Sequence, residues 1–405
     1  MSALFTKYYL TSYLPMINVV SFRPRVIQNG TAFEAMATIY KYLQTKYDYS
    51  FTIIKSESDN YQDPELKIIS LPTKQWQINP YLKSFSYIFK YKKPIVNLFK
   101  EADLVLTVDP TIYQQGVTAI EIANLLRKPV WFDTSRTDLA ITQTIGRKFK
   151  RRWLKSLMHK TTGIIVTVPK CIERFRSLGL FDQTTANKFT IMGHPVNLEQ
   201  FRPYAKTSEQ DKIIRVIVVS RLIPEKGLYY ILEAMSAILN QRQDVRWQLL
   251  GSGLLESWLR QEITNRKLQE RVDFLSPVSH QQLPAILAQA DIFVNHAISI
   301  AQWEEFFGVA NIEAMACGLP CVVSNSGGIP YVIREQDVAA MVEERNIIQL
   351  QEAISSLINS ASLREQMGDR ARSYVQNHYS LSSIGDKYHN MLQKSINSQH
   401  LITNN

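Results

Sequence analysis

The sequence predicts an α/β protein made of two doubly wound domains, each with a parallel sheet covered by helices on both faces. Short β-branched apolar runs alternate with amphipathic helical segments along most of the 405 residues, which is the pattern of βαβ units. The runs fall into two series, and a polar stretch at 203–212 without apolar periodicity separates them. A chain of this length is long enough for two such domains.

The first series of apolar runs predicts the strands of one sheet, at 17–22, 103–109, 129–133 and 163–168. The second series predicts the strands of another sheet, at 213–220, 247–251, 272–276, 291–295 and 320–325. Segments with helical periodicity lie between the strands, among them 228–242 and 257–268. We therefore assign residues 1–205 to a first Rossmann-like domain and 206–378 to a second.

Composition limits the class of protein. Hydrophobic residues make up 45% of the chain and charged residues 20%, which suits a globular protein with sizeable cores. No run of eighteen uncharged apolar residues occurs, so we expect no transmembrane helix, and the N-terminus lacks the pattern of a signal peptide. Cys171, Cys317 and Cys321 fit neither a metal-ligand spacing nor a disulfide framework, which favours the reducing cytoplasm.

The positive charge lies in the first half of the chain. The net charge is +10, and residues 1–200 hold 27 Lys and Arg against 15 Asp and Glu, whereas residues 201–405 hold 19 against 21. A basic surface on one side suggests a polyanionic partner, either anionic lipid or nucleic acid. Because no helix-turn-helix, RRM or zinc pattern is present, we expect no nucleic-acid partner.

The segment EFFGVANIEAMACGLPCVVSNSGGIP (305–330) is the most informative stretch. Glu305 and Glu313 are eight residues apart, and a helix is expected from about Gly308 to Cys317, where Gly318 and Pro320 end it. The unpaired backbone amides and the dipole at such a helix start bind anions. Taken alone, two glutamates beside a core helix are more often simply solvated.

A second loop carries two cations. In VSRLIPEKG (219–227) a strand ends at Ser220, so Arg221 and Lys226 follow at the carboxyl end of a parallel strand, where open α/β sheets bind ligands. A guanidinium fork and an ammonium group suit a diphosphate, although loop cations alone are usually solvated.

Together, these motifs resemble the large retaining GT-B glycosyltransferase family, the GT4-like or group 1 family, which includes sucrose synthase and bacterial mannosyltransferases. The resemblance runs through most of the second half of the chain. Its parts, in order, are GHPVNLEQFRP (193–203), SRLIPEKG (220–227), LLGSG (249–253), ADIFVN (290–295), EFFGVANIEAMACGLP (305–320), SNSGGIP (324–330) and HYSLSSIGDKYHNML (378–392). It implies two domains facing across a cleft and a closing helix, at about 379–397, that packs back onto the first domain.

The resemblance also implies a reaction. A hexose-type sugar passes from a nucleotide diphosphate sugar to an acceptor hydroxyl with retention of configuration, without a cofactor, a metal or an enzyme nucleophile. Arg221 and Lys226 hold the diphosphate, helped by the amides near Phe307 and Gly308. Glu313 binds the ribose and Glu305 contacts the transferred sugar. Fixed cations and amides stabilise the negative charge that grows on the leaving group.

The first half departs from the family pattern. Where the family has paired glycines after the first strand, this chain has SFRPRVIQNGTAFEAM, so Gly30 beside Asn29 is the candidate for the loop near the donor. Where many members have a histidine, PVWFDTSRTD places Asp133 with Arg136 nearby. Asp133 is a catalytic candidate as a contact to the sugar or as a proton acceptor, and the alternative is a helix N-cap or an ordinary loop aspartate. His296 is a further donor-site candidate, or a structural histidine.

Two basic segments, 81–100 and 146–160, interleave lysine and arginine with aromatic residues. Pro94 is expected to interrupt any helix in the first of them. On a helix, Phe149, Trp153 and Leu157 form one apolar stripe, and such helices suit an anionic membrane surface. We therefore expect peripheral association with the inner face of a membrane, and an acceptor that is lipid-linked or a polysaccharide precursor. The alternatives are a core-facing stripe for the helix and, for the whole chain, a catalytically silent protein that binds a sugar nucleotide or a partner.

Overall fold

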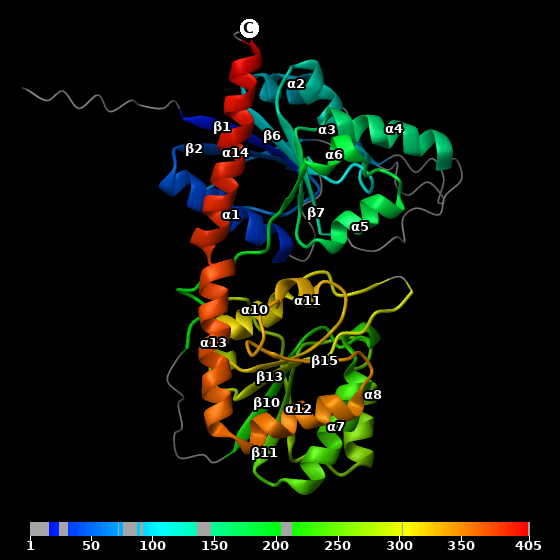
Figure 1. Cartoon of the computed structure of the whole chain (residues 1–405), viewed down its shortest axis with the longest axis vertical. Coiled ribbons are helices and arrows are strands. Elements are labelled where there is room, and N and C mark those ends of the chain that lie inside the picture. The colour runs from blue at the N-terminus through cyan, green and yellow to red at the C-terminus, as the bar shows by residue number, and fades with distance from the viewer. Residues whose placement is uncertain are drawn as a thin grey trace, which may run out of the picture.

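The structure is a computed structural model that describes residues 16–23, 31–71, 73–75, 87–89, 92–135, 147–203, 213–301 and 303–403. It contains two α/β domains stacked end to end, with one long C-terminal helical segment running along both (Figure 1). The predicted fold class is confirmed. None of the described helices is both long enough and apolar enough to span a bilayer.

The first domain is built on a parallel sheet with strand order β3-β2-β1-β6-β7-β8-β9. Its strands are β1 (Ile17–Phe22), β2 (Tyr49–Ser56), β3 (Lys67–Leu71), β6 (Leu104–Val108), β7 (Val130–Thr134), β8 (Gly163–Val166) and β9 (Phe189–Ile191). Its helices are α1 (Thr31–Lys46), α2 (Lys92–Glu101), α3 (Gln114–Leu125), α4 (Arg147–Lys160), α5 (Lys170–Ser177) and α6 (Gln183–Ala186). A separate antiparallel pair joins β4 (Thr73–Gln75) to β5 (Tyr87–Phe89).

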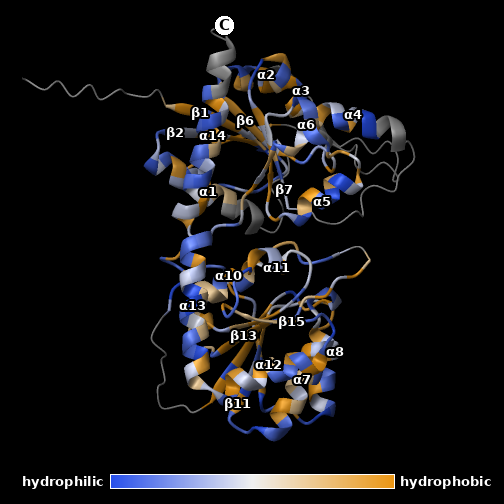
Figure 2. Ribbon diagram, in the orientation of Figure 1, coloured by the Kyte–Doolittle hydropathy of each residue, from blue (hydrophilic) through white to orange (hydrophobic). Residues whose placement is uncertain are grey.

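The second domain has a parallel sheet with strand order β12-β11-β10-β13-β14-β15. Its strands are β10 (Ile214–Val219), β11 (Val245–Leu250), β12 (Val272–Leu275), β13 (Ile292–Asn295), β14 (Cys321–Ser324) and β15 (Ala340–Val342). Its helices are α7 (Leu228–Gln241), α8 (Glu256–Asn265), α9 (Leu283–Leu287), α10 (Val309–Ala316), α11 (Ile329–Val332), α12 (Ile347–Asn359) and α13 (Ala361–Tyr379), with a 3-10 turn at Pro224–Lys226. Both sheets are apolar layers between more polar helix surfaces (Figure 2), as expected for strands buried on both faces.

The chain returns to the first domain through α14 (Leu381–Thr403), which follows α13 after the single residue Ser380. In Figure 1, α14 runs beside α1 across the first domain. The Tyr42 hydroxyl donates to Asp386 Oδ1 at 2.6 Å, and Trp131 Nε1 donates to Ser395 Oγ at 3.0 Å. These bonds fix the C-terminal helix to the first domain.

Every predicted strand is present, but two local predictions for the basic segments need correction. Pro94 does not interrupt a helix, because α2 begins at Lys92 and Pro94 lies in its first turn, where a missing amide hydrogen costs no bond. The apolar face of α4 is also shifted from the predicted stripe. Leu154, Leu157 and Met158 are buried, whereas Trp153 remains 38% exposed, because residues 154, 157 and 158 form the i, i+3, i+4 face that packs on the core.

Candidate active site

The residues of interest in the second domain lie where its strand order reverses. β10 and β13 are neighbours in the sheet although two strands separate them in the chain. Ligands of open α/β sheets bind beyond the carboxyl ends of the strands at this point. Arg221 follows β10 there, and its exposed side chain has no ion-pair partner among the residues that the structure describes. Arg221 is therefore available to an incoming anion.

Lys226, from the turn after Arg221, meets Glu305 from a loop 79 positions further along the chain. The two side chains form an ion pair, with Lys226 15% exposed and Glu305 13% exposed. The ammonium group also lies 5.0 Å from the centre of the Trp303 ring, a favourable cation–π position. The structure thus brings together two side chains that the sequence predicts to contact the same nucleotide sugar.

Beside this pair, α10 begins with unpaired backbone amides. Gly308 adopts φ +77° and caps the helix, a conformation that favours glycine, and a Cβ there would lie 2.6 Å from Asn311 Nδ2. Within the described residues, the amides of Gly308, Val309 and Ala310 have no hydrogen-bond partner. A helix start with unpaired amides, as the sequence predicts, is therefore present beside the loop that carries Glu305.

The loop that carries Glu305 is fixed by the glycine pair that follows β14. Gly328 donates its amide to the Glu305 carbonyl at 2.7 Å. Gly327 has φ +55°, and a Cβ on it would overlap that same carbonyl oxygen. The segment SGG (326–328) therefore allows two backbones to touch and holds Glu305 in place.

Glu313 lies in the second turn of α10 and is buried. Its Oε1 accepts a hydrogen bond from His280 Nε2 at 2.6 Å, and the His280 side chain is 41% exposed. His280 comes from the loop after β12, so the carboxylate is oriented by a neighbouring strand connection. Burial, reinforced by the Glu313 charge, raises the pKa of the nearby Cys317 thiol to about 12, so this cysteine stays protonated at neutral pH.

In the first domain, Asp133 lies within β7 near its carboxyl end and pairs with Arg23, which follows β1. Arg23 is only 6% exposed, so it is not the surface residue that its loop position could suggest. Burial acts to lower the pKa of Arg23, but Asp133 and Tyr40 outweigh this and hold it above its ordinary value. Arg23 Nε also donates to Ser21 Oγ, 3.3 Å away. Asp133 is thus a fixed, partly exposed carboxylate rather than a helix cap.

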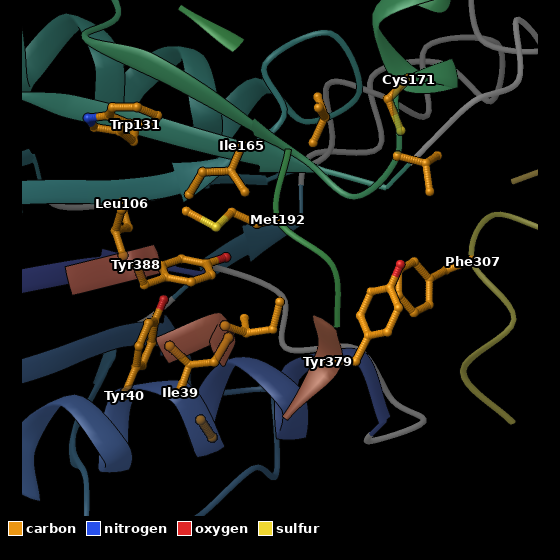
Figure 3. Packing of buried hydrophobic residues seen from close by; sticks show 14 of the residues in the cluster. Ile39, Tyr40, Leu106, Trp131, Ile165, Cys171, Met192, Phe307, Tyr379 and Tyr388 are labelled. Carbon is orange, nitrogen blue, oxygen red and sulfur yellow. The ribbon is translucent and has the colours of Figure 1, made fainter. Parts of the chain in front are cut away.

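The two domains meet at aromatic contacts near these residues. The His194 ring packs edge-on against Phe307 with centroids 4.8 Å apart, and Phe307 packs in the same way against Tyr379 at 5.6 Å. Figure 3 shows the Phe307 and Tyr379 rings side by side where α13 ends. Burial lowers the pKa of His194 to about 4, although the Asp133 carboxylate opposes this shift. Phe307 is itself buried, so its side chain belongs to the domain junction and only its backbone can serve a ligand.

His296 is a structural histidine in this fold. It is fully buried, its Nε2 accepts the backbone amide of Arg345 at 3.1 Å, and burial lowers its pKa to about 4. Its Nδ1 has no hydrogen-bond partner among the described residues. The remaining predicted residues, Asn29, Gly30 and Arg136, lie outside the part of the chain that the structure describes.

Three features of the site were not predicted from the sequence. Lys170, the first residue of α5, forms an ion pair with Glu304 at 2.6 Å, which joins the first domain to the loop that carries Glu305. His194 and His280 also lie at the site. The sequence contained one signal for these residues, because each follows a strand and so belongs to the carboxyl edge of its sheet.

Comparison with known proteins finds one similar family. The family model for glycosyl transferases group 1 matches residues 200–374, which include Arg221, Lys226, Glu305 and Glu313. Over these residues, which make up less than half of the chain, the protein is similar to the group 1 glycosyltransferases.

Two relatives illustrate how far this group 1 similarity extends. The GDP-mannose-dependent monoacylated alpha-(1-6)-phosphatidylinositol monomannoside mannosyltransferase of Corynebacterium glutamicum is 32% identical over 176 residues, which cover 43% of this chain and 45% of that protein. The phosphatidylinositol N-acetylglucosaminyltransferase GPI3 subunit of Saccharomyces cerevisiae is 28% identical over 176 residues, covering 42% and 37%. The matched segment therefore spans less than half the length of these relatives.

Solved structures extend the likeness to both domains at the level of the fold. A glycosyltransferase from Rickettsia africae superimposes with a TM-score of 0.74 at 17% identity, over 95% of this chain and 99% of that one. Anabaena HepE in complex with UDP and glucose gives a TM-score of 0.68 at 17% identity, over 93% and 100%. The segment similar to group 1 glycosyltransferases is thus one half of a GT-B fold that includes the first domain.

Proposed function

We propose that this chain is a retaining glycosyltransferase that moves a hexose-type sugar from a nucleotide diphosphate sugar to an acceptor hydroxyl. The observation that carries the proposal is the convergence of Lys226, Glu305 and the bare start of α10 beyond the β10–β13 switch point. Arg221 adds a cation without a partner among the described residues. The group 1 family match over this same segment supports the assignment.

The chemistry follows from the charges at this site. Departure of a nucleotide diphosphate develops negative charge on its phosphate oxygens, and the two cations and the α10 amides stabilise that charge from fixed positions. In this proposal they replace a metal ion, so added EDTA leaves the rate unchanged. Glu305 then contacts the sugar, and Glu313, oriented by His280, accepts hydrogen bonds from the ribose hydroxyls.

Asp133 is the proposed contribution of the first domain to the reacting centre. Its carboxylate is oriented by Arg23 and is partly exposed, so it can stabilise positive charge on the sugar or hold the acceptor hydroxyl. The acceptor attacks from the face that the leaving group vacates, which retains the anomeric configuration without an enzyme nucleophile. NMR of the product made from an α-configured donor tests retention, and a β-linked product would contradict it.

A donor screen tests the proposal directly. Thermal unfolding of the chain with UDP, GDP, ADP and their sugars should show a raised melting temperature for one nucleotide. Arg221→Ala and Lys226→Ala should abolish that shift, and Arg260→Ala, on the exposed face of α8, should leave it intact. If no nucleotide changes the melting temperature, the donor-site assignment is wrong. A shift without transfer or hydrolysis of the sugar would instead identify a catalytically silent binding protein.

We further propose that the first domain docks on an anionic membrane and that the acceptor is lipid-linked. Arg151, Arg152 and Trp153 are consecutive exposed residues on α4, and an aromatic ring beside guanidinium groups suits a lipid headgroup layer. Phosphatidylinositol derivatives appear in the names of both relatives described above. Other positive charges of this region are used internally, since Lys155 pairs with Asp182 at 2.8 Å.

Co-sedimentation with liposomes containing phosphatidylglycerol or phosphatidylserine tests the membrane proposal. We expect binding at low salt that weakens as salt is raised, and that falls further in the triple variant Arg151→Gln, Arg152→Gln, Trp153→Ser. The control variant Lys67→Gln removes an exposed charge from the opposite edge of the sheet. No binding at low salt would refute membrane docking and leave the donor site unaffected.

A further inference from the structure

One ion pair joins the first domain to the loop at the centre of the proposed donor site. Lys170 begins α5, four residues after β8 ends, and therefore lies at the carboxyl edge of the first sheet. Its Nζ is 2.6 Å from Oε2 of Glu304, and the two side chains are 29% and 15% exposed. An ion pair that is this close and this shielded is stronger than an open surface pair.

The pair acts on a short segment, residues 303–308, that we call the donor loop. The second domain holds this loop from one side, through Lys226 on Glu305 and through the amide of Gly328 on the Glu305 carbonyl. Lys170 holds it from the other domain, at the residue next to Glu305. Adjacent carboxylates in one loop are thus each neutralised by a lysine, and the two lysines come from different domains.

We infer that Lys170 is a positioning residue that clamps the donor loop to the first domain across the domain junction. It thereby sets the distance between Glu305 and Asp133, the carboxylate of the first domain. On the proposed function, the sugar lies between these two carboxylates. The inference deepens that function, because it states how the acceptor side is held in register with the donor side. It follows from the position of the ion pair and requires no ligand to be bound.

Removal of Lys170 has a definite consequence. Glu304 becomes a half-buried carboxylate without its partner, next to Glu305, and both then compete for Lys226. The first domain loses a direct attachment to the donor loop, so we expect the two domains to separate further on average. A misplacement of about 1 Å at reacting groups is enough to cost up to about a hundredfold in rate.

Ligand-free solution scattering tests the clamp without any assumption about the reaction. We expect Lys170→Met and Glu304→Gln each to raise the radius of gyration, and the double variant to raise it no further than either single change. Lys170→Arg should restore the wild-type value, and Lys67→Met, an exposed lysine elsewhere in the first domain, should have no effect. An unchanged radius in both single variants, or a double variant equal to the sum of the two, would overturn the inference.

Transfer kinetics supply the second readout. With the donor found by the screen, Lys170→Met should lower kcat about tenfold to a hundredfold, while the KM for the donor changes less than threefold. A loss confined to KM would mean that Lys170 binds the donor and does not position the loop. If no sugar nucleotide is turned over by the wild-type chain, the proposed function fails, whereas scattering still decides whether Lys170 and Glu304 hold the domains together.

Discussion

The Lys226–Glu305 ion pair leads to a prediction that separates nucleotide binding from transfer. Glu305 neutralises the ammonium group that we assign to the diphosphate, so in the ligand-free chain a carboxylate occupies the position of the anion. Glu305→Gln keeps the shape of this side chain and removes its charge. We therefore expect a nucleoside diphosphate without a sugar to bind the variant more tightly than the wild type, because Lys226 no longer has to leave a carboxylate.

The magnitude follows from the burial of the pair. A hydrogen bond between charged groups contributes about 1.5–3 kcal/mol, and part of this remains because glutamine still accepts a bond from Lys226. A net change of about 1–2 kcal/mol corresponds to about a 5- to 30-fold lower Kd. Transfer should move in the opposite direction, with kcat reduced about a hundredfold or more, since the carboxylate that contacts the sugar is lost.

Isothermal titration with UDP, GDP and ADP measures the affinity, and a radiolabelled sugar assay measures transfer. Glu352→Gln removes an exposed carboxylate from α12 and serves as the matched control, with neither quantity changed. A Kd that is unchanged or higher in Glu305→Gln would refute the idea that Glu305 competes with the diphosphate for Lys226.

Three further predictions concern stability. Burial holds the pKa of His296 at about 4, below the value of about 6.5 expected in the unfolded chain, so only the unfolded chain gains this proton between those values. The free energy of unfolding should therefore fall by about 1.4 kcal/mol per pH unit as pH drops through that window. Urea titrations at pH 7 and pH 5 should show a smaller loss of this free energy in His296→Gln than in the wild type. Arg174 and Asp109 form a buried ion pair at 2.9 Å, so Arg174→Met should lower the free energy of unfolding by about 3–5 kcal/mol in urea, and a loss below about 1 kcal/mol would contradict the burial argument. A Cβ on Gly163 would overlap the Trp131 ring, so Gly163→Ala should lower the free energy of unfolding in urea by about 1–3 kcal/mol. It should also speed proteolysis within α14, because the Trp131 ring is hydrogen-bonded to Ser395 of that helix.

The sequence predicted the elements with strong local patterns. The strand at 214–219 is rich in β-branched residues, and the helix at 309–316 lies between Gly308 and Gly318, so the predicted and observed bounds agree within a few residues. The prediction at Pro94 was wrong because proline breaks a helix interior but not its first turn, and the sequence alone did not place the helix start. Trp153 and Leu157 were placed on one apolar stripe, but Leu157 is buried and Trp153 is exposed. Several apolar sets on one helix compete, and only packing decides among them.

The residues of the candidate site divide in the same way. The sequence predicted four of them, because each belongs to a short motif of consecutive residues: Arg221, Lys226, Glu305 and Glu313. The pairs Lys170–Glu304 and Arg23–Asp133 join positions 134 and 110 residues apart, respectively. A single sequence contains no information about such pairings, because the sequence around a charged residue is the same whether its side chain is solvated or paired with a residue far along the chain.

The different states of Arg221 and Lys226 in the ligand-free chain predict different kinetic roles for the two cations. Arg221 is exposed and has no ion-pair partner in the part of the chain that the structure describes, so its field reaches an approaching diphosphate directly. Lys226 is shielded and already paired, so it contributes only after the ligand has arrived. Exposed charges act mainly on association, and desolvated ones on dissociation.

Stopped-flow binding of a fluorescent nucleoside diphosphate tests this division. Arg221→Ala should lower the association rate constant and flatten its dependence on salt, with a smaller change in the dissociation rate. Lys226→Met should leave association within about threefold and raise the dissociation rate about 10- to 150-fold, the equivalent of one charge-assisted bond of about 1.5–3 kcal/mol. If both variants act on the same rate constant, then Lys226 is released from Glu305 before the ligand arrives, and the ion pair does not persist in the free protein.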